Sequence, residues 1–483
     1  MQGFIIIGSS LVVTLLFTLL PGLRYLRQAL TANTRRVLFP ILAFVSTFLG
    51  SSHGADLTAG IPDPLRLVRV ALLIALALAA LFPIMQQLGT VVARAGAGAR
   101  WMAIYAMFAM LSATWSVGPI LSLWKGFEVL ALVIVVVAIA GRLRTLEDLQ
   151  WLHRLMALIF LFLCFTVLMG LAIFPAEAMK DSESRFAVRG LVLLFNPGSV
   201  GAVGGLLAVL MAATLLHADP ARRNSRAGIW VSFGIGILTM LLAHARTPMF
   251  ACIAAILLLL VYARRWRLLA VTAALGVILL AATALEDVLL NYIYRGQSTA
   301  QFTALTGRIA TWEIIWPQII KSPIIGQGYY SAQRMIFNVS TVDNTYLEVL
   351  FGIGIVGLVI FIVPILWAGF RIYASRPTSG HITLRNSLWL GTAGMFALIV
   401  IRGLAGPSFE TLHPLLIVYL LTQISVAVLI RTRTSSIPQA NSRHAPQQKQ
   451  ATGIHASRQP AGVLGRRDPH PLTTPRQSLR FKR

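Results

Sequence analysis

The sequence predicts an all-α integral membrane protein, a polytopic helix bundle with about 12–13 spans and one large outward loop. Hydrophobic residues make up 57% of the 483 residues and charged residues only 12%, with a mean hydropathy of +0.76. Apolar runs follow one another from Phe4 to Ile430, and each bilayer-spanning helix requires about 20 apolar residues. One polar segment, 286–345, interrupts this pattern. A soluble fold does not fit so apolar a composition, because its surface would remain largely hydrophobic.

The apolar runs are expected to be helices, because every backbone polar group in lipid must be satisfied within the segment or a closed barrel. Barrel strands alternate apolar and polar residues over about 10 positions, and these runs do not alternate. The first run has no basic region before it and no clear cleavage site, so it is interpreted as an anchor and not a removed signal peptide. The expected spans are 4–20, 37–50, 67–88, 101–111, 123–140, 155–174, 191–216, 229–243, 248–262, 268–285, 346–370, 386–403 and 412–430.

The orientation follows from the distribution of arginine. Alternate loops carry clusters such as Arg222/Arg223 and Arg264/Arg265, while most acids fall in the other loops. Arginine-rich loops are retained in the cytoplasm, so the polar segment 286–345 is expected to face outward. A long ordered loop in a compact domain is usually functional. We therefore divide the chain into N-terminal spans at 1–100, a membrane core at 101–430 with this periplasmic loop, and a tail at 431–483.

The tail at 431–483 contains eleven Lys/Arg and one acid, Asp468, and it contributes much of the net charge of +25. Its Pro, Gln and Ser content predicts a disordered basic cytoplasmic segment. Such charge can indicate nucleic acid, but no aromatic interleaving accompanies it. Attraction to anionic lipid headgroups is the favoured interpretation, and no nucleic-acid partner is expected.

The sequence indicates neither a metal site nor a cofactor. Cys164 and Cys252 lie within spans and are expected to pack there, and the histidines show no metal-ligand spacing. A G-x-G-x-x-G pattern at Gly352, Gly354 and Gly357 lies inside a span without a preceding strand, so close helix packing explains it better than nucleotide binding.

Four local patterns in the region 100–430 together resemble the O-antigen ligase and Wzy-type polysaccharide polymerase superfamily. Their order and spacing are more specific than any one of them. They are Leu111–Ser116 followed by Pro119; Arg189–Gly190 with Phe195–Pro197; Ala245–Thr247; and Thr306–Arg308 with Trp312, Pro323, Gly326, Gly328, Asp343–Glu348, Gly354 and Gly357. Ligases of this family typically have His-Asn where this chain has Asp343-Asn344, and that departure favours an exopolysaccharide or O-antigen polymerase.

The resemblance implies transfer of a glycan from undecaprenyl pyrophosphate to a sugar hydroxyl outside the cytoplasmic membrane. Arginine suits the leaving pyrophosphate because it stays charged and grips phosphate in a fork. We therefore expect Arg246 and Arg308 to be catalytic, with Arg189 and Arg334 in substrate binding. A snorkelling interfacial arginine remains the alternative for Arg246, and a solvated charge remains the alternative for Arg308.

Asp343 is expected to accept or orient the proton of the acceptor hydroxyl, and capping the helix that begins near Thr345 is the alternative. Asn344 and Glu348 are assigned to the same substrate site. Lys125 is either a further ligand of the pyrophosphate or the partner of Glu128 in an intramembrane ion pair. Aromatic residues of the loop are expected to bind saccharide, namely Trp312, Trp316, Tyr329 and Tyr330.

The resemblance implies a metal-independent, inverting glycosyltransferase of the bacterial cytoplasmic (inner) membrane that polymerises undecaprenyl-pyrophosphate-linked repeat units. Its expected partners are that lipid-linked oligosaccharide, a glycan acceptor, membrane lipids and other polysaccharide assembly and export proteins. An O-antigen ligase acting on lipid A core is the first alternative. A lipid-linked sugar flippase is the second, although no internal repeat of the kind common in transporters is evident. A cell-shape or division protein without catalysis is the third.

Overall fold

A computed structural model describes residues 34–48, 64–179, 187–191, 193, 196–216, 223–281, 308–330, 342–377 and 383–434. Within these residues the fold is all helical, with no strand. The described residues all belong to one compact unit. The expected first span at 4–20 and the tail beyond Thr434 lie outside the described residues, as does Arg334.

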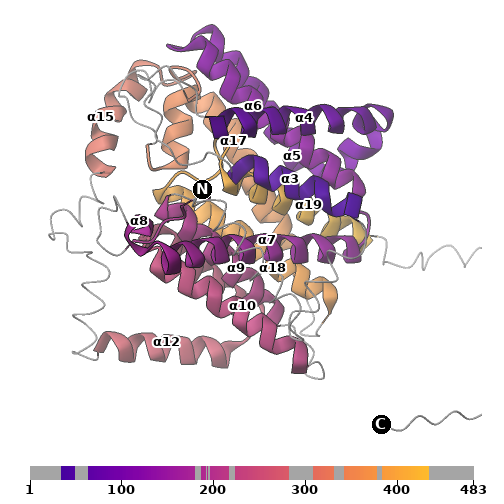
Figure 1. Ribbon diagram of the computed structural model, residues 1–483. Helices are drawn as coiled ribbons and strands as arrows, with labels where there is room; N and C mark the ends of the chain where they lie inside the picture. The colour runs from indigo at the N-terminus through magenta and orange to yellow at the C-terminus, as the bar shows by residue number, and fades with distance from the viewer. Residues whose placement is uncertain are drawn as a thin grey trace, which may run out of the picture. The chain divides into compact units, whose positions relative to one another are not determined.

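Most of the expected spans coincide with helices, which confirms the all-α, multi-pass prediction (Figure 1). Seven described helices are long and apolar enough to cross a membrane, and three apolar helices are shorter. The helices are α3 (Thr34–Phe48), α4 (Pro64–Gln86), α5 (Leu88–Leu111), η3 (Ser112–Thr114), α6 (Pro119–Arg142), α7 (Leu146–Ile173), α8 (Pro175–Ala178), α9 (Pro197–Leu216), α10 (Arg223–Leu242), α11 (Arg246–Tyr262), α12 (Trp266–Ala281), α15 (Arg308–Lys321), α17 (Thr345–Ala374), α18 (Leu384–Arg402), η4 (Gly403–Ala405) and α19 (Pro414–Thr434).

Several boundaries differ from the predicted ones because polar residues extend the helices beyond their apolar runs. The run at 101–111 is only the second part of α5, which passes through Arg94 and has a non-helical residue at Gly96. Helix α7 begins nine residues earlier than expected, where Thr145 and Asp148 form a reciprocal capping box. Helix α19 includes the first residues of the predicted tail and ends at Thr434.

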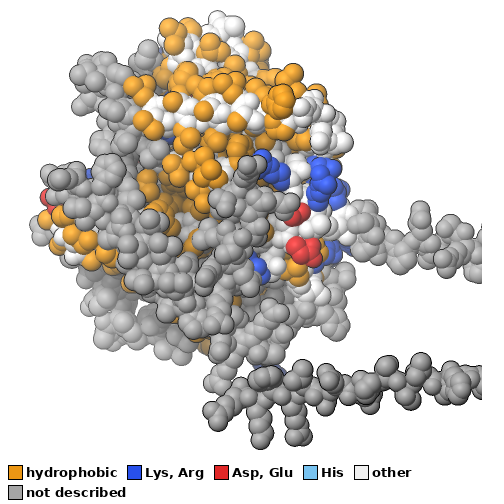
Figure 2. All heavy atoms as spheres, turned by 45° about the vertical axis from the view of Figure 1, so that its right-hand side comes forward, with side chains coloured by type: hydrophobic (Ala, Val, Ile, Leu, Met, Phe, Trp, Pro, Cys, Tyr) orange, Lys and Arg blue, Asp and Glu red, His pale blue; other side chains and the backbone are white. Residues whose placement is uncertain are grey.

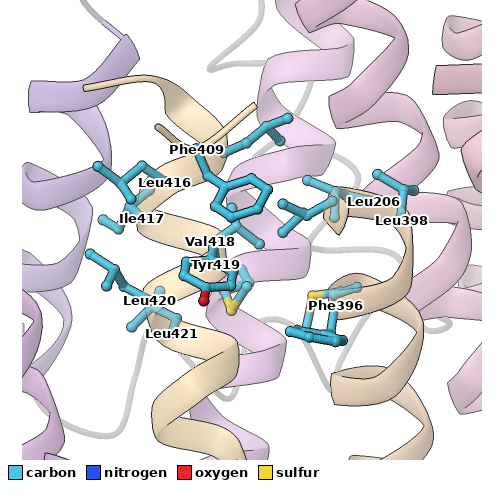
Figure 3. Packing of buried hydrophobic residues seen from close by; sticks show 14 of the residues in the cluster. Leu206, Phe396, Leu398, Phe409, Leu416, Ile417, Val418, Tyr419, Leu420 and Leu421 are labelled. Atoms are coloured by element: carbon cyan, nitrogen blue, oxygen red, sulfur yellow. The ribbon is translucent and has the colours of Figure 1, made fainter. Parts of the chain in front are cut away.

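The centre of the bundle is formed by α9, α18 and α19, which pack through large apolar side chains (Figure 3). The rings of Phe409 and Tyr419 stack with centroids 4.5 Å apart, and Tyr419 also stacks on Phe396. Helix α9 crosses α10 where Gly204 faces Gly236, and a Cβ on either glycine would meet backbone atoms of the other helix. Small residues allow this close approach, as is common between helices in membranes.

Large apolar side chains also cover the outside of the bundle. On α4, Leu78, Phe82 and Met85 are 63%, 70% and 76% exposed. Figure 2 shows hydrophobic side chains spread over the described surface of one face, with Lys and Arg gathered at one side. Exposed apolar surface on this scale suits contact with lipid.

Arginines bind helix ends on the side predicted to be cytoplasmic. Arg94 donates to the carbonyl of Gly141 at 3.0 Å, Arg265 to Leu216 at 3.3 Å, and Arg433 to Ala374 at 2.9 Å. The last carbonyls of a helix have no partner within it, so these side chains satisfy them from neighbouring elements. These arginines thus have a role in packing as well as the orienting role that the sequence predicts.

Candidate functional site

A break in α17 holds the segment that follows α15. Gly354 has a φ of 66° and Ile353 is also non-helical, so the helix is interrupted near its start. Segment 323–328 pairs with the broken turn: Gly328 donates to the carbonyl of Gly352 at 2.7 Å, and Ile355 donates to that of Pro323 at 2.9 Å. The G-x-G-x-x-G pattern therefore serves close backbone packing, but between a loop and a broken helix rather than between two helices.

The Leu111–Ser116 motif holds the same segment from the other side. The amide of Tyr329 donates to Ser112 Oγ at 3.0 Å, Trp115 Nε1 to the carbonyl of Ile325 at 3.0 Å, and Ser122 Oγ to the carbonyl of Tyr329 at 2.7 Å. Two motifs about 200 residues apart in the chain thus pack against each other and form one scaffold.

We expect Gly328→Ala to lower the thermal unfolding midpoint of the purified protein. Gly328 has a φ of 110°, and a Cβ there would overlap Ser116. Backbone strain of this kind costs on the order of 1–3 kcal/mol. Gly234→Ala is the matched control, because nothing lies within 4 Å of a Cβ at that helical position. Equal midpoints for the two variants would contradict the proposed role of Gly328.

Three of the predicted site residues lie at or just before the starts of different helices. Arg308, the first residue of α15, places Nε 3.6 Å from Asp343 Oδ2 and donates through Nη1 to Thr247 Oγ1 at 3.5 Å. Arg246 begins α11 and lies close enough to Arg308 for their positive charges to repel. The side chains of Arg308 and Asp343 are 27% and 43% exposed, so both charges remain accessible. Arg308 is thus paired with Asp343 and bound to Thr247, the residue that follows Arg246. Guanidinium groups gathered in this way suit a phosphate-bearing ligand.

The capping interpretation of Asp343 is wrong, because Asn344 caps α17. Asn344 Oδ1 accepts from the amides of Tyr346 and Leu347, both at 3.0 Å, and its Nδ2 donates to the carbonyl of Leu404. Asp343 has a φ of 57°, a left-handed conformation that Asp and Asn tolerate better than most residues. This turn leaves the Asp343 carboxylate facing Arg308 instead of the helix start.

A buried polar cluster beneath these residues was not anticipated from the sequence. Arg402, only 4% exposed, donates to Ser408 Oγ at 2.9 Å and to the carbonyls of Pro407 and Gly198. Its charge attracts Asp343 and Glu410 and repels Arg308. Glu410 Oε2 accepts from Thr345 Oγ1 at 2.7 Å and from two backbone amides. A lone arginine at the end of an apolar run was the available signal, because buried charge in a membrane protein marks functional regions.

Ligases of the family that this chain resembles have a histidine where this chain has Asp343. His413 lies beside the buried cluster, but it does not take over the role of that histidine. Burial, together with the charge of Arg402, lowers the pKa of His413 to about 3. The ring is therefore neutral at any pH well above 3, and its Nδ1 accepts from the amide of Leu415 at 3.2 Å. Asp343 remains the more accessible proton acceptor at this end of the bundle.

Three other residues predicted to bind substrate form hydrogen bonds with the backbone of neighbouring segments. Arg189 donates through Nε to the carbonyl of Glu177 at 3.2 Å, and Trp312 Nε1 donates to that of Val342 at 3.0 Å. Glu348, 5% exposed, accepts from the amide of Val342 at 3.4 Å. The contacts of Trp312 and Glu348 with Val342 fix the turn that presents Asp343, whereas Arg189 binds the end of α8.

The predicted ion pair between Lys125 and Glu128 is present, with Nζ and Oε2 2.8 Å apart. Arg69 of α4 approaches the other oxygen of Glu128 at 3.7 Å, so the group links α4 to α6. Lys125 also lies over the ring of Tyr330, 5.2 Å from its centroid. Lys125 thus connects the ion pair with Glu128 to the segment that follows α15.

The predicted saccharide-binding aromatics differ in exposure. Trp316 is 53% exposed, whereas Tyr329 is 3% exposed and donates its hydroxyl to the carbonyl of Glu410. Tyr329 is therefore a core residue and not a surface that glycan can contact. Among the described residues, no group of three His, Cys, Asp or Glu side chains could hold a metal ion.

The apolar helices define a multi-pass membrane protein. Arg308, Asp343, Arg402 and Glu410 give it a site with arginines and carboxylates at one end of its helix bundle. Residues 231–362 match the sequence model of the O-antigen ligase family, which confirms the resemblance to the O-antigen ligase and Wzy-type superfamily. The matched region contains Arg246, Arg308 and Asp343, but not Arg402 or Glu410. No curated protein matches the chain. The match supports a membrane glycosyl-transferring enzyme with a role in polysaccharide or O-antigen assembly.

Proposed function

We propose that this protein polymerises undecaprenyl-pyrophosphate-linked oligosaccharide repeat units at the periplasmic face of the inner membrane. The observation that carries this proposal is that Arg308 contacts both Asp343 and Thr247, the residue that follows Arg246 at the start of α11. The substrate then has its pyrophosphate at the arginines, its polyprenyl chain in the bilayer and its glycan on the outward side.

The proposed reaction is a single displacement. The acceptor hydroxyl oxygen attacks the anomeric carbon of the donor glycan, the bond from that carbon to the pyrophosphate oxygen breaks, and undecaprenyl pyrophosphate leaves. The proton of the hydroxyl passes to the carboxylate of Asp343. Arg246 and Arg308 stabilise the negative charge that develops on the leaving group, which is the type of contribution that dominates many enzymes. One displacement inverts the anomeric configuration.

The choice of polymerase over ligase rests on Asp343, which stands where ligases of the resembling family have histidine. A polymerase uses a sugar hydroxyl of another lipid-linked repeat as acceptor, whereas a ligase uses lipid A core. Reconstituted protein given only the lipid-linked repeat unit should make a ladder of longer glycans. Glycan transfer only after lipid A core is added would favour the ligase, and no transfer in either case would favour a transporter.

We expect EDTA to leave this activity unchanged, because the arginines supply the positive charge that a divalent ion supplies in other sites. The measurement is the rate of glycan lengthening by purified protein before and after chelation. A fall in rate that Mg²⁺ or Mn²⁺ restores would contradict a metal-independent mechanism.

A further inference from the structure

A cavity lies at the end of α6, away from the arginine and carboxylate site. Its volume is about 550 Å³, within the range of roughly 300–1,000 Å³ that small-molecule sites occupy. It lies between α3, α4, the start of α5 and the end of α6. Its apolar lining includes Phe39, Ala80, Pro83, Ile84, Val91 and Ala138.

The apolar part of this cavity adjoins a lipid-facing surface. The same stretch of α4 that lines it carries Phe82 and Met85 on its exposed side, at 70% and 76% exposure. Ala79 is exposed and also lines the cavity. A hydrocarbon chain therefore fits this lining better than a water-soluble metabolite does.

The polar part of the cavity carries positive charge. Arg142 and Arg144, both exposed, line it together with Gln87 and Asp148. Arg142 lies over the ring of Phe39, 5.3 Å from its centroid, and within the described residues neither arginine forms an ion pair. Asp148 adds negative charge, but its Oδ2 already accepts from the amides of Arg144 and Thr145.

Two further arginines satisfy the carbonyls at the end of α6. Arg94 donates to the carbonyl of Gly141 at 3.0 Å, and Arg431 donates to that of Leu143 at 3.4 Å. Four guanidinium groups thus surround this helix end. Arg94 and Arg431 serve the backbone, which leaves the charges of Arg142 and Arg144 available to a ligand.

We propose that this cavity binds an anionic glycerophospholipid, with an acyl chain against α3, α4 and α6 and the phosphate at Arg142 and Arg144. These arginines lie at the end of the bundle that the charge distribution predicts to be cytoplasmic. Basic pockets between helices on that side suit anionic headgroups. The site is separate from the glycan-transferring residues and does not depend on the function proposed for them.

The test is native mass spectrometry of the delipidated full chain titrated with phosphatidylglycerol or phosphatidylcholine. We expect tighter binding of phosphatidylglycerol, and a loss of roughly 30-fold in Arg142→Gln/Arg144→Gln, since each arginine near a membrane surface contributes about a factor of five. Arg371→Gln/Arg376→Gln is the matched control, because those arginines also lie over aromatic rings, Trp367 and Tyr373, but do not line the cavity. An equal loss in the control would reduce the effect to general charge attraction and overturn the proposal.

A second variant, Ala138→Phe, fills the cavity and leaves the charge unchanged. We expect it to abolish phosphatidylglycerol binding while the unfolding midpoint remains that of the unmodified chain. If Ala138→Phe does not fold, the comparison of Arg142→Gln/Arg144→Gln with Arg371→Gln/Arg376→Gln tests the lipid site by itself. Three results would each contradict the proposed site. They are unchanged lipid binding by folded Ala138→Phe, equal affinity for phosphatidylglycerol and phosphatidylcholine, and a spectrum that shows dimers of the protein but no lipid adduct.

Discussion

Arg308→Ala and Arg246→Ala should each abolish polymer while the protein remains in the membrane. Each substitution removes one of the two guanidinium groups assigned to the pyrophosphate, whose positive charges act on each other. Losing one such electrostatic contact to a developing negative charge typically costs about 10²- to 10³-fold in rate. The measurement is the rate of glycan lengthening by reconstituted protein, with membrane content quantified in parallel.

Arg308→Lys should also be impaired, because the ammonium group is a point charge and cannot grip phosphate in a fork. In this structure it also cannot contact both Asp343 and Thr247 as the guanidinium does. Lys321→Ala is the matched control, since it removes an exposed cation from the other end of α15. If Arg246→Ala or Arg308→Ala makes glycan of normal length, the arginine that was replaced is not catalytic.

Asp343→Asn should lower the rate by about 10²- to 10⁴-fold, the usual contribution of a general base, while donor binding persists. Asparagine tolerates the left-handed backbone at this position, where φ is 57°. It keeps the shape of the side chain and removes only the proton acceptor and the negative charge. Because Asn344 caps α17, the substitution leaves the helix start intact.

Loss of the charge on Asp343 also removes the partner of Arg308, so donor affinity must be measured together with the rate. A positioning role for Asp343 predicts weaker donor binding, whereas a base predicts a slower reaction with unchanged donor affinity. Asn344→Ser is the control for the neighbouring cap, because serine caps helices about as well as asparagine. A near-normal rate of glycan synthesis by Asp343→Asn would show that Asp343 is not the base. The catalytic contribution would then come from Arg246 and Arg308.

Much of the site was predictable because its residues lie where local sequence patterns change. Arg246 and Arg308 each begin a helix, and Asp343 directly precedes the residue that caps another. Whether such residues meet depends on contacts between elements that are far apart in sequence. The pairing of Arg308 with Asp343 and Thr247 required the positions of α11, α15 and α17 together.

The sequence by itself determined the helical membrane fold, because the length and polarity of each apolar run are local properties that lipid constrains strongly. Only the tertiary structure decided that Asn344 caps α17, that Tyr329 is buried, and that Arg402 and Glu410 lie beneath the site. The physical reason is that the backbone angle of a turn and the burial of a charge depend on which distant segments supply hydrogen bonds. Here the broken turn of α17 and the loops after α15 and α18 supply them.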